Sequence, residues 1–172
     1  MREPSPYLSI AVLAFVTLQR LAELIYARRN ERRLRARGGR EHAPEHYWLL
    51  VTLHGAWLMG LWLMAVQEAV NLAWLAAFLA LQGLRLWVLA TLRERWTTRI
   101  VVIPAAPLIK TGPYRFMSHP NYAIVAGEIF LLPMAFGLYA FAIVFSLLNA
   151  AILRMRIRAE NRALRLPSEL PR

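Results

Sequence analysis

Residues 122–153 read YAIVAGEIFLLPMAFGLYAFAIVFSLLNAAIL, and the length of this apolar stretch decides the fold. A helix needs about 20 apolar residues to cross a bilayer, so the stretch is too long for one span and short for two. It contains Pro133 and Gly137, which break or turn a helix. Because arginines lie on both sides of it, the positive-inside rule predicts that the chain enters the membrane and returns to the same side. We therefore predict a tight hairpin of two short helices.

Three more apolar runs precede this stretch, at residues 7–27, 47–66 and 72–92, and hydrophobic residues make up 58% of the sequence. The pattern predicts an all-α, polytopic integral membrane protein with five transmembrane helices, the last two forming the hairpin. We expect one membrane domain over residues 1–172. Within it, residues 7–92 hold three spans, and residues 93–165 hold a core made of a polar loop, the hairpin and a C-terminal helix.

Basic residues fall between the spans in a pattern that predicts the orientation. The connector at 67–71 carries Glu68 and no basic residue, so we expect it outside, with the N-terminus also outside and the C-terminus inside. The formal net charge of +11 then reflects cytoplasmic loops and attraction to anionic membrane lipids, and we predict no nucleic-acid partner. The basic segments contain Arg28, Arg29, Arg32, Arg33, Arg35, Arg37 and Arg40; Arg93, Arg95, Arg99, Lys110 and Arg115; and Arg154, Arg156, Arg158, Arg162, Arg165 and Arg172.

Two residue types are missing from the sequence. It has no cysteine, which excludes a disulfide framework, a thiolate metal site and a cysteine nucleophile. It also has no aspartate, which removes the Asp-rich motifs that hold Mg²⁺ and pyrophosphate in many membrane enzymes. We predict no metal site.

Several ionisable side chains within the spans share one depth. Counting about 1.5 Å per residue from the cytoplasmic end of each predicted span, Arg20, His54 and Arg85 lie about 10 Å deep and Glu128 about 9 Å. Such groups are costly in a membrane and face a bundle interior or a watery cavity. The layer predicts a cytoplasm-facing reaction chamber with Arg85, Glu128 and His54 as candidate catalytic residues. The plainer alternative is that Arg20 pairs with Glu23, three residues on, and that Arg85 reaches toward the headgroups.

Residues 112–122 read GPYRFMSHPNY and separate the third span from the hairpin. Pro113 and Pro120 fix φ at two points, so the backbone is held in place. Arg115 and His119, four residues apart, are both able to donate to a carboxylate, and the two tyrosines offer aromatic faces with hydroxyl tips, which suits a ligand with an anionic end and a flat ring. A loop of prolines and aromatics at the interface is also typical of a membrane anchor, and both interpretations stay open.

Two motifs carry a resemblance to a known family. Residues 96–122, WTTRIVVIPAAPLIKTGPYRFMSHPNY, are followed by the hairpin and then by RIRAENRAL at 156–164. This arrangement resembles the C-terminal core of the isoprenylcysteine carboxyl methyltransferase family, integral membrane enzymes that use S-adenosylmethionine. The family pattern is Gly-x-Tyr, then Arg-His-Pro-x-Tyr and, after the hairpin, an arginine followed by Glu-Glu and a leucine. Here Ser118 replaces the arginine before His-Pro, and Asn161 replaces the second glutamate.

The resemblance implies that residues 93–165 are a methyltransferase core, which holds S-adenosylmethionine between the loop and the C-terminal segment. Methyl transfer is an in-line displacement at an electrophilic sulfonium, so the protein mainly aligns a nucleophile and excludes water. The cofactor contacts implied by the resemblance are Leu108, Gly112, Tyr114, Arg115, His119, Pro120, Asn121, Tyr122, Arg156 and Glu160.

The segment leading into the loop resembles more specifically a bacterial branch associated with O-methylation of lipid-like polyketides such as alkylpyrones. It implies a methyl acceptor oxygen, whether carboxylate, phenol or enol, on a lipophilic small molecule that enters sideways between helices. The expected location is a bacterial inner membrane, with the active site facing the cytoplasm. For a phenol or enol, Arg85 would stabilise the oxyanion and Glu128 or His54 would take the proton.

Two other functions stay open. Membrane sterol reductases end in a similar Gly-x-Tyr…Ser-x-Pro-Asn-Tyr loop, so NADPH-dependent reduction of a lipid double bond is one alternative, and Ser118 with Asn121 moves the loop toward it. A non-catalytic membrane scaffold is the other. The acceptor, the choice of oxygen over sulfur or nitrogen, and the oligomeric state are left open by the sequence.

Overall fold

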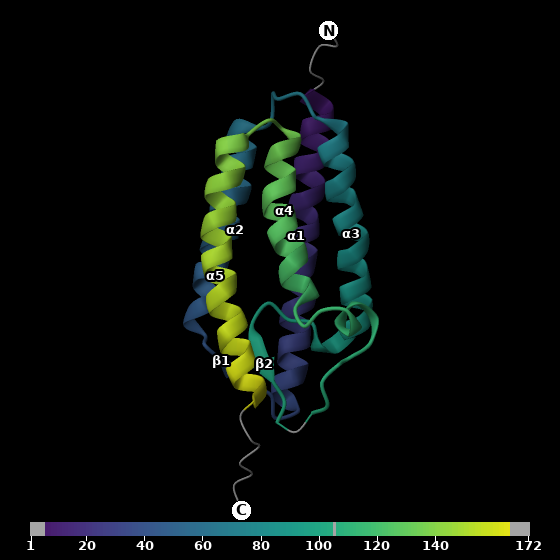
Figure 1. Cartoon of the computed structure of the whole chain (residues 1–172), viewed down its shortest axis with the longest axis vertical. Helices are drawn as coiled ribbons and strands as arrows, with labels where there is room; N and C mark the ends of the chain where they lie inside the picture. Colours follow the sequence, from purple (N-terminus) through teal and green to yellow (C-terminus); the bar gives the residue numbers. More distant parts are fainter. Residues whose placement is uncertain (1–5, 105, 166–172) are drawn as a thin grey trace, which may run out of the picture.

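The protein is an elongated bundle of five helices in a computed structural model that describes residues 6–104 and 106–165 (Figure 1). Arg172, the last of the predicted tail arginines, lies outside the described residues, as does the side chain of Arg165. In chain order the elements are α1 (Pro6–Ala36), β1 (Arg40–His42), α2 (Glu45–Met64), α3 (Leu72–Leu92), η1 (Arg93–Arg95), β2 (Ile100–Val102), η2 (Gly112–Arg115), α4 (Pro120–Ala135) and α5 (Tyr139–Arg165).

Four of the helices, α1, α2, α3 and α5, are long and apolar enough to cross a membrane. The fifth, α4, has 16 residues and is shorter than the roughly 20 that a full span needs. The hairpin predicted at 122–153 is present, because α4 ends at Ala135 and the chain turns back through Gly137, whose φ is 71°. The prediction of two short helices is wrong for the second, since α5 has 27 residues and continues through the basic tail.

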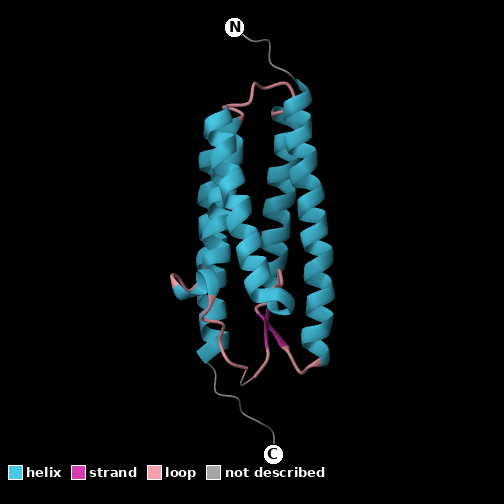
Figure 2. Ribbon diagram, turned by 90° about the vertical axis from the view of Figure 1, so that its right-hand side faces the viewer, coloured by secondary structure: helices cyan, strands magenta, loops and turns pink. Residues whose placement is uncertain are grey.

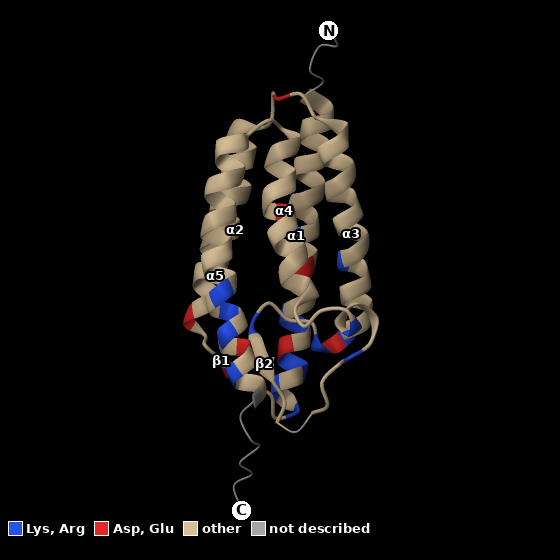
Figure 3. Cartoon of the chain, in the orientation of Figure 1, with Lys and Arg blue, Asp and Glu red and all other residues tan. Residues whose placement is uncertain are grey.

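The charged residues gather at one end of the bundle (Figure 3). We call this the charged end; it holds β1, β2 and the segment from η1 to α4 (Figure 1). At the opposite, apolar end, the α2–α3 connector and the α4–α5 turn lie together, joined by a hydrogen bond from the Asn71 amide to the Ala135 carbonyl at 2.8 Å. Helix α1 runs past its predicted end at Ala27 to Ala36, because arginine, glutamate and leucine are good helix formers and the extension carries them into the charged end.

A two-stranded antiparallel sheet, which the all-α prediction lacked, closes the charged end (Figure 2). It pairs β1 with β2, Glu41 lying opposite Val101. The three β-branched residues of β2 favour a strand, but their partner lies far away in the sequence, so local patterns do not reveal the pairing. The Arg99 guanidinium holds the sheet to the bundle: it donates to Glu41 Oε1 at 2.6 Å and lies 3.8 Å over the Tyr47 ring.

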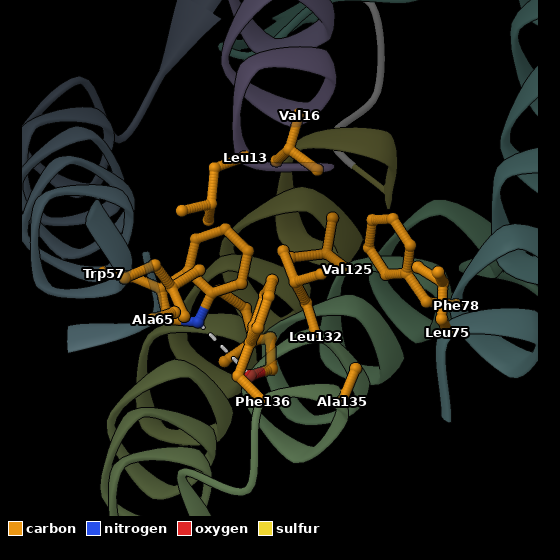
Figure 4. Packing of buried hydrophobic residues seen from close by; sticks show 12 residues of the cluster. Leu13, Val16, Trp57, Ala65, Leu75, Phe78, Val125, Leu132, Ala135 and Phe136 are labelled. Atoms are coloured by element: carbon orange, nitrogen blue, oxygen red, sulfur yellow. Dashed lines mark hydrogen bonds between the residues drawn. The ribbon is translucent and has the colours of Figure 1, made fainter. Parts of the chain in front are cut away.

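The apolar core packs side chains from all five helices together, among them the buried Trp57 (Figure 4). Pro133 has no N–H, so within α4 it leaves the carbonyl four residues earlier, that of Ile129, without its helical donor. The indole Nε1–H of Trp57 donates to this carbonyl at 3.3 Å. The proline therefore shapes the packing of α4 against α2 as well as the hairpin.

Candidate active site

One cavity of about 930 Å³ connects the charged end with the polar side chains inside the bundle. Its walls come from all five helices, from the segment after α3 and from the loop before α4. Three of the predicted site residues, Gly112, Pro120 and Glu128, do not line it. The predicted residues that do are His54, Arg85, Leu108, Tyr114, Arg115, His119, Asn121, Tyr122, Arg156 and Glu160.

The loop and α5 meet through direct side-chain contacts. Tyr122 Oη donates to Glu160 Oε2 at 2.7 Å, and the Tyr122 ring is stacked on His119 with centroids 5.5 Å apart. His119 Nε2 lies 3.1 Å from Asn161 Oδ1, while its Nδ1 lies 3.7 Å from Glu160 Oε2. Asn161, where the family pattern has a second glutamate, thus contacts the same histidine. The two motifs that are far apart in the sequence form one cluster.

Arg156 supplies a buried cation beside this cluster. Its side chain is on the cavity wall, and only 3% of the residue is exposed. One nitrogen, Nη2, donates to the Thr98 carbonyl at 2.7 Å, and the Nε has no hydrogen-bond partner among the described residues. A buried guanidinium with an uncommitted donor suits an anionic ligand group such as a carboxylate.

The residues around the cluster position it. Gly112 has φ +57°, and a Cβ there would lie 2.4 Å from Thr91 Oγ1, so only glycine lets the loop dock on α3. Pro120 is the first residue of α4, where its missing N–H costs nothing.

Asn121 and Tyr114 are side chains on the cavity wall. Asn121 Oδ1 accepts from Trp96 Nε1 at 3.4 Å. Burial, together with the nearby Glu160 carboxylate, raises the pKa of Tyr114 far above its ordinary value, so its hydroxyl stays a neutral donor.

The polar layer within the spans is a network of crossed ion pairs. Glu128, fully buried, accepts from Arg20 at 2.7 Å, from Gln82 and Arg85 Nε at 2.8 Å each, and from Arg85 Nη2. Glu23 lies 2.9 Å from both arginines. Arg20 and Glu23 do pair, as the plainer interpretation expected, but they pair with α3 and α4 as well. Every side-chain nitrogen of Arg85 therefore has a carboxylate partner.

Arg20 is a wall residue that the catalytic prediction left out, although its depth matched that of Arg85. Its side chain is 18% exposed against 2% for Arg85, and its Nε has no hydrogen-bond partner in the described part of the chain. The difference comes from the packing of α1, which the sequence does not report. Of these two arginines, Arg20 is the one that keeps a buried nitrogen without a partner among the described residues.

His54 lines the cavity, and a hydrogen bond fixes which of its ring nitrogens carries the hydrogen. Its Nδ1 lies 2.9 Å from the Leu50 carbonyl, which can only accept, so this nitrogen carries a hydrogen. In the neutral ring Nε2 is then the proton acceptor. Of the two candidate bases, His54 is on the cavity wall and Glu128 lies behind it.

Leu108 and Arg115 lie at the mouth of the cavity, and both are exposed. The strand β2 also forms part of the wall, and the ion pairs of Arg99 hold it in place. Burial alone would raise the pKa of Glu41, but hydrogen bonds from Arg99 and Arg35 outweigh it and lower the pKa below its ordinary value. The sheet that the sequence did not predict therefore helps to build the site.

Comparison with known proteins identifies relatives. The sequence profile of the isoprenylcysteine carboxyl methyltransferase (ICMT) family matches residues 74–166. The chain is 37% identical over 158 residues to the uncharacterized protein YpbQ of Bacillus subtilis (strain 168), which covers 89% of this chain and 94% of the relative. No solved structure matches the chain.

Proposed function

Since the chain belongs to the isoprenylcysteine carboxyl methyltransferase family, a family of membrane methyltransferases, we propose that it uses S-adenosylmethionine to methylate an oxygen of a lipophilic small molecule. The observation that carries the proposal is the cavity that joins the cluster formed by the loop and α5 to the polar layer within the bundle. A reaction between a polar cofactor and an apolar acceptor needs a polar binding site and an apolar binding site that meet where the methyl group is transferred. Family membership favours this function over lipid reduction or scaffolding.

The residues of the cluster fit the cofactor. S-adenosylmethionine carries a carboxylate, an ammonium group and ribose hydroxyls, and when bound it supplies an electrophilic methyl group on a sulfonium. Arg156, with its uncommitted Nε, suits the carboxylate, and Glu160 suits the ammonium or hydroxyl groups. His119 and Tyr122 hold Glu160 in place and offer stacked rings beside it. The remaining contacts that family resemblance implies are Leu108, Gly112, Tyr114, Arg115, Pro120 and Asn121.

The acceptor is proposed to enter between α1 and α2. The cavity wall there is apolar and includes Leu21, which is 53% exposed, and Val51, which is 39% exposed. Gly55 is also on this wall, and a Cβ added to it would meet nothing within 4 Å. We place the opening between these helices toward lipid, because both helices are long and apolar enough to cross a membrane. A lipophilic molecule reaches the polar layer by this route without passing through water.

The polar layer is proposed to receive the acceptor's head. His54 Nε2 takes the proton from a phenol or enol, since the other ring nitrogen already donates to Leu50. Arg85 and Arg20 stabilise the developing oxyanion, and Arg20 has an Nε without a hydrogen-bond partner among the described residues. Glu128 is a positioning residue in this scheme, because its carboxylate holds both guanidinium groups and lies off the cavity wall.

We propose a bacterial inner-membrane location with the charged end in the cytoplasm, N-terminus out and C-terminus in. The concentration of basic residues at one end supports this orientation by the positive-inside rule (Figure 3). It requires α4 to act as a short fifth span alongside α5. The membrane domain would then cover residues 1–172, with residues 93–165 as the catalytic core and residues 7–92 as the spans that complete the cavity.

Titration calorimetry of S-adenosylmethionine, S-adenosylhomocysteine and NADPH into the detergent-purified protein tests the cofactor. Both S-adenosyl compounds should bind, and Tyr122→Phe should weaken them severalfold because it frees the Glu160 carboxylate. Tyr139→Phe is the matched control, since Tyr139 is 58% exposed at the apolar end. Binding of NADPH alone would assign the protein to the reductases, and binding of none of the three would favour the scaffold.

Turnover with lipophilic phenols, pyrones and carboxylic acids tests the acceptor chemistry. Arg85→Ala and His54→Ala should each abolish methyl transfer and leave S-adenosylhomocysteine binding nearly intact. His46→Ala serves as the control, because His46 does not line the cavity. Loss of cofactor binding in the His54 variant, or full turnover without His54, would contradict its assignment.

A further inference from the structure

The loop that carries Tyr114 and His119 has a second face that the cavity does not use. Tyr114 and His119 line the cavity, whereas Phe116 and Met117, which lie between them in sequence, do not. Phe116 is 70% exposed and Met117 49% exposed. These two large apolar side chains are exposed at the charged end of the bundle. The position of the loop indicates what kind of surface covers them.

The loop folds back along α3 rather than projecting into water. The Phe116 ring packs against the Trp87 indole with centroids 6.4 Å apart at 60°. Trp87 lies five residues before the end of α3, which places it about 7.5 Å back along the helix at about 1.5 Å per residue. Gly112 touches Thr91 on the same helix. Phe116 is therefore at the depth of the final turns of a transmembrane helix.

The length of α4 indicates the same depth. Its 16 residues extend about 24 Å, against a hydrocarbon core of about 30 Å. Its far end is level with the apolar-end connector, because Asn71 bonds to Ala135. Pro120, the first residue of α4, therefore starts inside the apolar layer, and the loop residues just before it lie at the membrane interface.

The apolar patch of the loop is continuous with the lipid-facing surface of α3. Beside Trp87, which is 44% exposed, Leu84 is 45% and Leu86 is 67% exposed on the same helix. Lys110 and Arg115 are exposed in the same loop, and the Arg115 guanidinium lies 5.1 Å from the centre of the Phe116 ring. Cations next to aromatic and apolar side chains match the headgroup layer of an anionic membrane.

We propose that the loop at residues 107–118 inserts into the headgroup region of the bilayer, with Phe116 and Met117 among the lipids and Lys110 beside anionic phosphates. The membrane then holds the outer face of a loop whose inner face carries Tyr114 and His119. Insertion does not depend on methyl transfer. Its effect on the cofactor, which rests on the proposed function, is that anionic lipid strengthens cofactor binding.

Site-directed labelling tests the insertion directly, because the chain has no cysteine of its own. A nitroxide is placed at Met117→Cys in nanodiscs, and its collisions with oxygen and with a water-soluble nickel complex are compared by paramagnetic resonance. Leu86→Cys provides the lipid-exposed reference and Arg32→Cys the water-exposed reference. Met117→Cys should collide with oxygen more than with nickel, as Leu86→Cys does. A ratio equal to that of Arg32→Cys would overturn the insertion.

Cofactor affinity tests the coupling. S-adenosylhomocysteine is titrated into nanodiscs of phosphatidylcholine with and without phosphatidylglycerol. The native protein should bind more tightly with the anionic lipid, and the double variant Phe116→Ser, Met117→Ser should lose about tenfold in affinity, or about 1.4 kcal/mol. The control, Leu63→Ser with Met64→Ser, changes residues 79% and 50% exposed at the apolar end and should bind normally. Equal affinity with and without phosphatidylglycerol, together with equal affinity of the native protein and the Phe116→Ser, Met117→Ser variant, would overturn the coupling. No binding of S-adenosylhomocysteine by the native protein would count against the proposed function.

Discussion

Replacing Glu128 by glutamine tests whether the polar layer is a balanced network. The carboxylate is fully buried and accepts from Arg20, Arg85 and Gln82. Glutamine has nearly the same shape but carries no charge and turns half of its group into a donor. The two guanidinium groups are then left with one carboxylate, that of Glu23, in place of two.

The cost follows from the burial of these charges. Removing one partner of a buried ion pair costs about 3–5 kcal/mol, because it leaves an uncompensated charge. Since Glu23 still lies 2.9 Å from both arginines, we expect the lower end, about 3 kcal/mol. For a chain of this size, at about 2–4 °C per kcal/mol, the unfolding midpoint should fall by about 6–12 °C.

Thermal unfolding in detergent, followed by the fluorescence of the six tryptophans, measures this shift. Glu68→Gln is the matched control, because Glu68 is exposed at the apolar end and its side chain should contribute little. The double variant Glu128→Gln, Arg20→Gln should recover part of the loss, since one cation then faces one carboxylate. A midpoint for Glu128→Gln no lower than that of Glu68→Gln would refute the reasoning, and so would a double variant less stable than the sum of its parts.

Three further predictions concern the sheet, the loop and the opening between α1 and α2. The lowered pKa of Glu41 contributes stability that is present above its ordinary pKa near 4.5 and is lost as the pH falls through the lowered value, so the midpoint gap between the native protein and Glu41→Gln should close in acid. Glu45→Gln is the matched control, because the Glu45 side chain is 69% exposed. Gly112→Ala should weaken S-adenosylhomocysteine severalfold in calorimetry, and adding Thr91→Ala should restore only part of the affinity, because the clash is relieved but the positive φ remains. Gly55→Leu should raise the acceptor KM without changing cofactor affinity, and an unchanged KM would contradict the proposed route.

Part of the candidate site follows from the sequence because its residues come in compact motifs. Tyr122 and Glu160, predicted from separate motifs to share a site, are hydrogen-bonded to each other. The structure adds Asn161, whose Oδ1 lies against His119. Asn161 lies beside His119 in space because the hairpin brings the first turn of α4 next to the last turns of α5. Asn161, which departs from the family pattern in the sequence, therefore makes a contact within the cluster.

The polar layer shows where prediction from sequence ends. Depth in the membrane can be counted along each span, so the shared level of Arg20, His54, Arg85 and Glu128 was visible. Only the Arg20–Glu23 pair within α1 follows from spacing in the sequence; the pairs between helices do not, because they depend on how each helix is rotated about its axis. That rotation places Arg20 on the cavity wall and Glu128 behind it.

The sequence by itself determined the membrane class, the approximate positions of the helices and the end of the bundle that carries the charges, because hydropathy and arginine placement act on each segment separately. The tertiary structure decided which residues meet. Lipid tails are as apolar as a protein core, so a leucine facing lipid and a leucine facing another helix look alike in the sequence. For the same reason only the folded chain distinguishes the inner face of the loop, with Tyr114 and His119, from the outer face with Phe116 and Met117.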